Sequence, residues 1–314
     1  MPPAEDYPRT LIEFQERFAT EEACRQYLEQ LRWPDGFRCP ACGADHGWRT
    51  GRGLWFCARC SRQTSATAGT IFESTRKPLR MWFQAMWLVT SQKIGISALG
   101  LQRQLGFQRY ETVWTWLHKL RRAMVRPGRE RLSGTVEVDE TYIGGREEGV
   151  DGRETETKSI VVIAAEESGR GIGRIRLRRV ADASAASLVP FVEEAVAPGA
   201  VVHTDAWRGY AALARQGYEH KVTAIKRSGQ LAHELLPRVH RVAALLNRWW
   251  LGTHQGAILP RHLDYYLDEF TFRFNRRTSR QRGKLFYRLV QQALNVDPVS
   301  WSDVAEGRRA RRGN

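Results

Sequence analysis

The chain has 314 residues, which is enough for two or three compact units. Its 49 lysines and arginines exceed its 34 aspartates and glutamates, giving a net charge of +15. This excess favours a polyanionic partner, most simply nucleic acid. The sequence has no apolar run near the roughly 20 residues of a membrane-spanning helix, no signal-peptide pattern and no lipidation motif. We therefore expect a cytoplasmic, nucleoid-associated protein with no membrane partner.

Residues 1–66 are predicted to form an N-terminal helical segment and a small ribbon. Apolar side chains recur at helical spacing over 10–31, and Thr20 before two glutamates is typical of a new helix start. Two Cys-x-x-Cys pairs follow, with fourteen residues between the pairs. The paired residues are Cys39 and Cys42, then Cys57 and Cys60.

This cysteine spacing predicts structural zinc. Four thiolates complete a tetrahedral Zn²⁺ site and leave no position for catalytic water. A redox pair or free thiols are the alternatives, but a redox Cys-x-x-Cys needs no partner pair. Cys24 lies in a predicted helix and is expected to be a small buried hydrophobe. The arginines around the ribbon form either a DNA-contacting face or a solvated one.

Residues 67–128 are predicted to be a helical DNA-binding region. After a polar, small-residue stretch, a buried helix is expected over Leu79–Ser91. A short helix over Ile96–Leu105, a break at Gly106 and a longer basic helix over Tyr110–Met124 then resemble a helix-turn-helix, although ordinary helical hairpins share this pattern. The predicted DNA contacts on the longer helix are Lys119, Arg121 and Arg122.

The third region, 129–292, opens with a strand that carries acids. Val136 and Val138 alternate with Glu137 and Asp139, so period two puts the valines on one face and the acids on the other. A carboxylate on such a strand is unfavourable unless a cation pairs with it, and the alternative is an exposed edge with solvated acids. A second apolar strand, starting at Ala200, runs into Asp205.

The element order after residue 129 indicates the fold. Three strands, a crossover helix, a fourth strand ending at Asp205, a fifth strand and further helix give the ribonuclease-H-like layout. The predicted strands and helices after the Asp139 strand are Lys158–Ala165, Gly173–Val180, Ser184–Ala195, Ala200–Asp205, Tyr218–Ile225 and a helical stretch from Leu235 onwards. We predict an α/β protein with a mixed sheet and flanking helices, in which Asp139 and Asp205 lie on adjacent central strands. Paired carboxylates suit Mg²⁺ or Mn²⁺.

The chain resembles the ISXO-like insertion-sequence transposases from about residue 10 to 292. The resemblance rests on the ribbon, the helical hairpin and four longer blocks. These blocks are Val-Glu-Val-Asp139-Glu-Thr-Tyr-Ile-Gly-Gly, His-Thr-Asp205-Ala-Trp-Arg-Gly-Tyr, Leu251-Gly-Thr-His-Gln-Gly and 262–277. It implies two-metal DNA cleavage, in which Asp139 bridges both ions and Asp205 holds one. Water attacks first, and the freed 3′-hydroxyl then attacks target DNA.

The third metal ligand departs from the family pattern. Related transposases have a glutamate, or in some branches an asparagine, on the following helix and then a lysine. Alignment on the Gly-Thr-His-Gln-Gly block places His240 at the glutamate position and Asn247 at the lysine position. We assign His240 to ligand or acid–base work, with DNA contact as the alternative for that residue. Glu234 and Glu269 are the acidic alternatives.

The end of the chain is strongly basic. Predicted DNA contacts there are Arg248, Arg273, Arg276 and Arg277. A solvated helix face is the simpler explanation, but the net charge favours phosphate binding. Residues 293–314 are predicted to be a basic C-terminal tail that adds non-specific attraction to DNA.

We predict a transposase that cuts and joins DNA at the terminal inverted repeats of its own insertion sequence. The expected partners are double-stranded DNA at those repeats and at the target, with a homodimer or larger assembly on DNA. The alternatives are a decayed transposase, a zinc-ribbon regulator that binds without cutting, or a structure-specific nuclease on the same fold.

Overall fold

The chain folds into two compact units. The computed structural model describes residues 5–126, 128–144, 158–224, 229–256 and 258–307. Unit 1 comprises Met1–Arg126 and Ser279–Asn314, and unit 2 is the intervening Pro127–Thr278. Within the described ranges, no helix combines the length and apolar character needed to cross a membrane.

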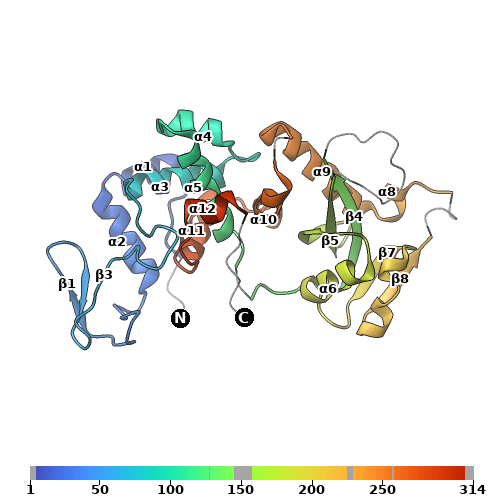
Figure 1. Cartoon of the computed structure of the whole chain (residues 1–314), viewed down its shortest axis with the longest axis horizontal. Helices are drawn as coiled ribbons and strands as arrows, with labels where there is room; N and C mark the ends of the chain where they lie inside the picture. Colours follow the sequence, from blue (N-terminus) through green and yellow to red (C-terminus); the bar gives the residue numbers. More distant parts are fainter. Residues whose placement is uncertain (1–4, 127, 145–157, 225–228, 257, 308–314) are drawn as a thin grey trace. The chain divides into compact units, whose positions relative to one another are not determined.

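Unit 1 contains a three-stranded ribbon and a set of helices. Its strands, in the antiparallel order β1-β2-β3, are β1 (Gly47–Arg49), β2 (Trp55–Cys57) and β3 (Gln63–Thr64). Its helices are α1 (Leu11–Arg17), α2 (Glu21–Arg32), α3 (Leu79–Ser91), α4 (Ala98–Leu105), α5 (Tyr110–Ala123), α11 (Arg282–Ala293) and α12 (Trp301–Ala305). Figure 1 shows α11 and α12, in red, beside the blue-green helices α3 and α5.

The expected helix starts and breaks in unit 1 are present. The segment 10–31 forms two helices, because the Thr20 side chain accepts a hydrogen bond from Ala23 N (3.1 Å) and caps α2. Ser97 caps α4 through Gly100 N (3.1 Å). Gly106 ends α4 in the left-handed conformation (φ 67°), which glycine adopts without strain.

The core of unit 1 depends on α11. Phe286 of α11 is fully buried, and its ring lies 5.3 Å from Phe14 and 5.5 Å from Phe83, between ring centroids. The compact units therefore differ from the predicted division, which assigned 279–292 to the third domain and 293–314 to a tail. Residues 294–307 include α12, which packs on α5. Val304 of α12 is fully buried. Residues 308–314 lie outside the described ranges.

Unit 2 is an α/β structure around one five-stranded sheet. Its strands are β4 (Thr135–Ile143), β5 (Ser159–Ser168), β6 (Gly171–Val180), β7 (Val201–Asp205) and β8 (Glu219–Thr223). Its helices are α6 (Ala185–Ala195), η1 (Arg208–Tyr210), η2 (Leu213–Gln216), α8 (Ala232–Leu235), α9 (Pro237–His254), η3 (Pro260–His262) and α10 (Leu263–Phe274).

The sheet has the predicted mixed topology. Its strand order is β6-β5-β4-β7-β8, with β4, β5 and β6 antiparallel and β7 and β8 parallel to β4. A meander followed by the crossover helix α6 gives this order, which confirms the expected fold class. It also makes β4 and β7, the strands of Asp139 and Asp205, direct neighbours. The second glycine of the predicted turn, Gly145, and the predicted end of the fifth strand, Ile225, lie outside the described residues.

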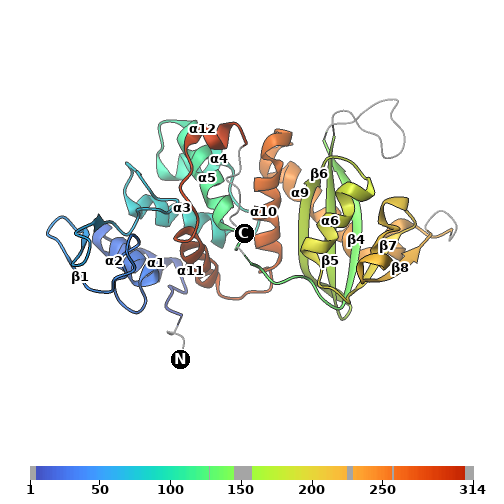
Figure 2. The same cartoon turned by 60° about the horizontal axis from the view of Figure 1, so that its bottom comes forward.

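Helices cover both faces of the sheet (Figures 1 and 2). Val136 and Val138 pack with Leu188 and Val192 of α6 on one face. On the other face, Val161 and Ile163 of β5 share a core with residues of α9 and α10. The acids of β4 alternate with its valines, so Glu137 and Asp139 belong to the α9 face.

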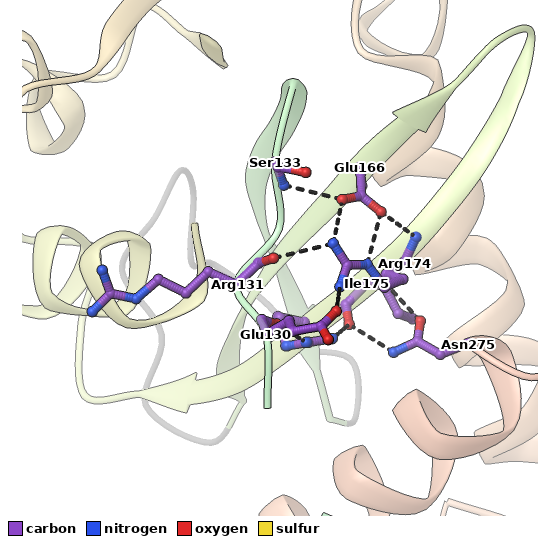
Figure 3. A network of polar contacts seen from close by, with 8 residues as sticks. Glu130, Arg131, Ser133, Glu166, Arg174, Ile175 and Asn275 are labelled. Carbon is purple, nitrogen blue, oxygen red and sulfur yellow. Dashed lines mark hydrogen bonds and ion pairs between the residues drawn. The ribbon is translucent and has the colours of Figure 1, made fainter. Parts of the chain in front are cut away.

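A polar network fixes the start of β4 (Figure 3). The Glu166 carboxylate accepts hydrogen bonds from Ser133 N (3.0 Å) and from Nη2 of Arg174 (2.8 Å). The same guanidinium donates to the carbonyl of Arg131 (3.1 Å). At the end of α10, the Asn275 amide pairs with both backbone groups of Ile175, accepting from N (2.7 Å) and donating to O (3.1 Å).

Candidate active site and zinc ribbon

The two aspartates lie on neighbouring strands and on one face of the sheet. β4 and β7 pair as Thr135↔Val201 through Glu137↔His203. The paired stretch ends two residues before each aspartate. Because side chains alternate along a strand, Asp139 lies on the same side as Glu137, and Asp205 on the same side as His203. Alternation therefore puts both aspartates on the face that α9 covers.

Glu137 anchors α9 over this face. Its carboxylate accepts hydrogen bonds from the backbone N of Arg238 (2.7 Å) and Val239 (3.0 Å) and from Nη1 of Arg238 (2.8 Å). A carboxylate at a helix N-terminus satisfies donors that have no partner within the helix. A buried acid on this strand was expected to pair with a cation. That cation is Arg238, and its partner is Glu137.

That anchor brings His240 to Asp139. Nε2 of His240 lies 3.5 Å from Oδ2 of Asp139, and the two side chains are 31% and 13% exposed. Burial lowers the pKa of His240, opposed by Glu137 and reinforced by His233, which favours the neutral imidazole. Among the described residues, its Nε2 is buried without a hydrogen-bond partner.

The turn after Asp205 ties the two strands together. Oδ1 of Asp205 accepts a hydrogen bond from Trp207 N (3.0 Å), and Nε1 of Trp207 donates to the carbonyl of Ala183 (2.6 Å). The hydroxyl of Tyr210 donates to Oε2 of Glu140 on β4 (2.7 Å). Sequence reasoning did not assign these residues a role, although the spacing of Trp207 and Tyr210 after Asp205 was available as a signal.

The charges of both aspartates affect the pKa of Tyr210. Burial raises the pKa of its phenol well above the usual value, and the negative charges of Glu140, Asp139 and Asp205 raise it further. The phenol therefore stays protonated and serves as a permanent donor to Glu140. It connects the β4 and β7 parts of the site from the α6 side of the sheet.

The acidic alternatives for the third ligand lie elsewhere. The Glu234 carboxylate accepts a hydrogen bond from Leu231 N (3.1 Å) and caps the short helix α8. Glu269 is buried in α10 and pairs with Nε of Arg273 (2.9 Å), and α10 packs on β6 rather than on β4. Of the three candidates, His240 is the one placed beside Asp139 in the described part of the chain, at 3.5 Å.

The donor set fits a divalent cation. Carboxylate oxygens are the ligands that Mg²⁺ and Mn²⁺ prefer, and the imidazole nitrogen of His240 beside Asp139 is a further possible donor. The three side chains are less tightly gathered than the zinc ligands. In the described ranges, the cysteine group is the one set of three or more such ligand atoms within 4.8 Å of one another.

The four cysteines form a compact metal site. Sγ of Cys39 lies 3.6 Å from Sγ of Cys60, and Cys42 and Cys57 are separated by the same distance. Tetrahedral zinc with Zn–S bonds of about 2.3 Å requires sulfur separations of roughly 3.8 Å. The left-handed conformation of Gly43 (φ 73°) and of Ser61 (φ 58°) follows each pair and turns the chain back. This geometry confirms the predicted zinc ribbon.

Backbone N–H groups favour the thiolate form of Cys39 and Cys57. Burial disfavours the Cys39 thiolate, but hydrogen bonds from Ala41 and Cys42 outweigh it and lower the pKa of Cys39 to about 6. The N–H of Cys60, then that of Arg59, lowers the pKa of Cys57 against the effect of burial. Thiolate is the form that binds zinc. Cys24 is buried and belongs to α2, as predicted.

The predicted DNA contacts on α5 are less exposed than expected. Arg121 is 1% exposed, so its side chain offers no surface to a duplex, and this part of the prediction is corrected. The reason is that α5 packs against α4, α11 and α12 and buries most of its circumference. Lys119 and Arg122 are half-buried.

Of the four arginines of unit 2 that were predicted to contact DNA, one is exposed and three contact other residues of the unit. Arg248 is exposed on α9. Arg273 pairs with Glu269, whereas Arg276 stacks over the ring of Phe272 (4.1 Å to the centroid). Arg277 donates to the carbonyls of Ile172 and Gly173 on β6. Arg273, Arg276 and Arg277 therefore all contact other residues of unit 2.

Comparison with known proteins agrees with this architecture. Residues 131–275 match the family model of the ISXO2-like transposase domain, and residues 19–63 match the transposase zinc-ribbon domain. The chain is also 27% identical over 290 residues to an uncharacterized protein in transposable element ISH50 of Halobacterium salinarum, covering 85% of this chain and 94% of that protein.

Proposed function

Because the chain belongs to the ISXO2-like transposases, we propose that it cuts the terminal inverted repeats of its own insertion sequence and joins the freed ends to target DNA. The observation that supports this proposal is that β4 and β7, the strands that carry Asp139 and Asp205, are neighbours in the sheet, with His240 beside Asp139. Transposase membership follows from the family. The cleavage chemistry and its residues are our inference.

The side chains of the site have separate tasks in this proposal. Asp139 and Asp205 hold the divalent cations, and His240 supplies a third ligand or accepts a proton from the attacking hydroxyl. Glu137 and Tyr210 hold α9 and the 205–210 turn in place around them. Bound Mg²⁺ or Mn²⁺ would activate the attacking oxygen and stabilise the leaving oxygen in an in-line displacement at phosphorus.

Replacement of each aspartate tests the proposal. Asp139→Asn and Asp205→Asn remove a charged ligand with little change in volume, so each variant should lose cleavage of labelled terminal-repeat DNA by at least about a hundredfold. Binding of the same DNA, measured by gel shift without divalent metal, should remain. Cleavage at the original rate by either variant would falsify the assignment.

The metal preference tests His240. An imidazole nitrogen is a poorer donor to Mg²⁺ than to Mn²⁺, so the unmodified protein should cut better in Mn²⁺. His240→Glu should narrow that ratio by supplying an oxygen ligand, and His240→Ala should lose activity in both metals. A ratio that does not respond to His240→Glu would exclude His240 as a ligand.

The same assays distinguish a transposase from a DNA-binding regulator without catalytic activity. A protein that shifts terminal-repeat DNA but never cuts it in Mg²⁺ or Mn²⁺ would be a binder only. Joining of two ends requires two sites in one complex, so we expect a dimer or larger assembly on DNA. Light scattering of the protein–DNA complex measures this directly.

A further inference from the structure

Two neighbouring cavities in unit 1 share one wall. The larger, of about 870 Å³, lies between the 73–77 loop, the first half of α5 and the start of α12. The smaller, of about 650 Å³, lies between the same loop, α2 and the ribbon. Thr75, Arg76 and Lys77 line both cavities. The 73–77 loop therefore separates two adjacent cavities.

The smaller cavity is strongly basic. Its acid is Glu21, whose carboxylate already accepts hydrogen bonds from the backbone N of Leu79 (2.8 Å) and Arg80 (3.2 Å). The lining cations are Arg25, Arg52, Arg76, Lys77 and Arg80. Excess positive charge along a groove suits a phosphodiester backbone.

The larger cavity adds indole rings to this charge. Trp82 and Trp116 stack on each other at 3.6 Å between centroids and are buried, whereas Trp301 is 58% exposed. Arg109 and Lys119 contribute further cations to the same lining. The acids of this cavity are Glu73 and Glu111, and Glu73 accepts a hydrogen bond from Gly69 N (2.6 Å).

This combination selects an unpaired nucleotide over an intact duplex. A duplex keeps its bases stacked inside and presents only phosphates to a basic groove. An unstacked nucleotide presents a flat base and a phosphate together, and bases stack on aromatic side chains with little sequence preference. A volume of about 870 Å³ lies within the usual range for ligand pockets.

We propose that the two cavities bind an unpaired stretch of DNA, with phosphates along the smaller cavity and a base against Trp301 in the larger one. This proposal rests on the proposed function, because cutting the two strands at offset positions leaves unpaired nucleotides at the DNA ends. It assigns a ligand to the 73–77 loop and to α12, which neither the zinc ribbon nor the carboxylate site explains.

Trp301→Ala in the full chain tests the stacking. The probe is a mixed-sequence duplex with a short 3′ overhang that carries 2-aminopurine at the first unpaired position, compared with the blunt duplex in buffer without divalent metal. The variant should lose on the order of tenfold affinity for the overhang probe and the associated fluorescence quenching. Affinity for the blunt duplex should not change. Trp48→Ala is the matched control, because Trp48 is 53% exposed and lines neither cavity.

Removing positive charge from the shared wall tests whether the wall binds the phosphates of unpaired DNA. The double variant Arg76→Ala with Lys77→Ala should bind the overhang probe more weakly and with a shallower salt dependence. Its control replaces the exposed cations Lys93 and Arg103, which line neither cavity. Equal losses in both double variants, or unchanged overhang binding by Trp301→Ala, would overturn the proposal.

Failure of this proposal can be distinguished from failure of the proposed function. A protein that needs Trp301 for overhang binding but never cuts would overturn the proposed function alone. Suppose instead that cleavage depends on Asp139 but that both probes bind equally well with and without Trp301. That result would overturn only the proposed binding of unpaired DNA in the two cavities.

Discussion

At the scale of single residues, two acids on β4 have opposite fates. Glu137 and Asp139 share one face of the strand, because they are two positions apart. Glu137 is 2% exposed and fully engaged at the start of α9, whereas Asp139 faces His240. Alternation predicted the shared face correctly. It could not tell the two acids apart, since the difference depends on where α9, a hundred residues away in the chain, begins.

Glu166 gives a residue-scale prediction about pH. Burial disfavours its carboxylate, but hydrogen bonds from Arg174 and Ser133 outweigh this and lower its pKa from 4.5 to about 2. A lowered folded-state pKa stabilises the protein above the unfolded pKa, and the contribution is lost as the pH falls from about 4.5 towards 2.

Glu166→Gln should therefore destabilise the protein at pH 7 by roughly 2 kcal/mol, below the full linkage value because Arg174 is a third exposed. The difference from the unmodified protein should shrink as the pH drops below about 4.5. Urea unfolding followed by circular dichroism across this range measures it. A difference that is independent of pH would mean that packing, and not charge, explains the loss.

At the scale of elements, α10 closes the free edge of the sheet. β6 is an edge strand, and side chains from α10 and its end bond to its outward backbone groups. Asp264 accepts from Arg179 N, Asn275 pairs with Ile175, and Arg277 donates to Ile172 O. Unpaired edges promote association between chains, so this cover keeps β6 from pairing with another sheet.

The edge cover gives the arginines near residue 275 a structural role that their sequence did not predict. A basic, aromatic-rich stretch is typical of a DNA-binding face, and nothing local shows that Arg277 bonds to carbonyls a hundred residues earlier. The helix caps at Thr20 and Ser97 were predictable because they depend on neighbours only. The strand order was predictable because meander and crossover rules leave few arrangements.

The turn from Asp205 to Tyr210 gives an element-scale prediction. A Cβ on Gly209 would lie 2.7 Å from the carbonyl of Ala183 and 2.8 Å from Nε1 of Trp207, the two atoms of the hydrogen bond that holds the turn. Gly209→Ala should destabilise unit 2 by about 1–3 kcal/mol and reduce cleavage.

Gly252→Ala is the matched control for this substitution. A Cβ on Gly252, in α9, meets nothing within 4 Å, so the change should be neutral or slightly stabilising. Thermal unfolding of both variants makes the comparison. Equal stability of Gly209→Ala and the unmodified protein would show that the turn can shift without affecting the fold.

At the scale of the whole molecule, zinc should matter to one unit only. The four thiolates lie in unit 1, where Phe37 stacks on Trp55 beside them and Arg49 pairs with Glu22 of α2 (2.7 Å). So small a ribbon has little core of its own. Removal of zinc should raise amide exchange across 37–64 and leave β4 to β8 unchanged.

Hydrogen–deuterium exchange with mass spectrometry, before and after chelation, measures this effect. Cys57→Ser should reproduce the exchange pattern of the chelated protein and lower bound zinc well below one ion per chain. Equal loss of protection in the sheet of unit 2 would contradict the independence of the two units.

The position of α11 was the largest feature of the whole molecule that sequence reasoning placed differently. Its helical pattern over 282–293 is clear, but amphipathic spacing does not specify which core the apolar face joins. Phe286 enters the aromatic core of unit 1 because Phe14, Phe18 and Phe83 leave a space for it. Only the assembled helices define that space.

Because α11 follows unit 2 in the chain but belongs to unit 1, unit 1 can be completed only late in synthesis. The ribosome releases the ribbon and the helices up to α5 first, but their core lacks Phe286 until the whole sheet unit has been translated. A nascent chain that stops before Ser279 therefore carries an unfinished first unit. The protein consequently acquires its complete N-terminal unit only once the carboxylate-bearing unit has emerged.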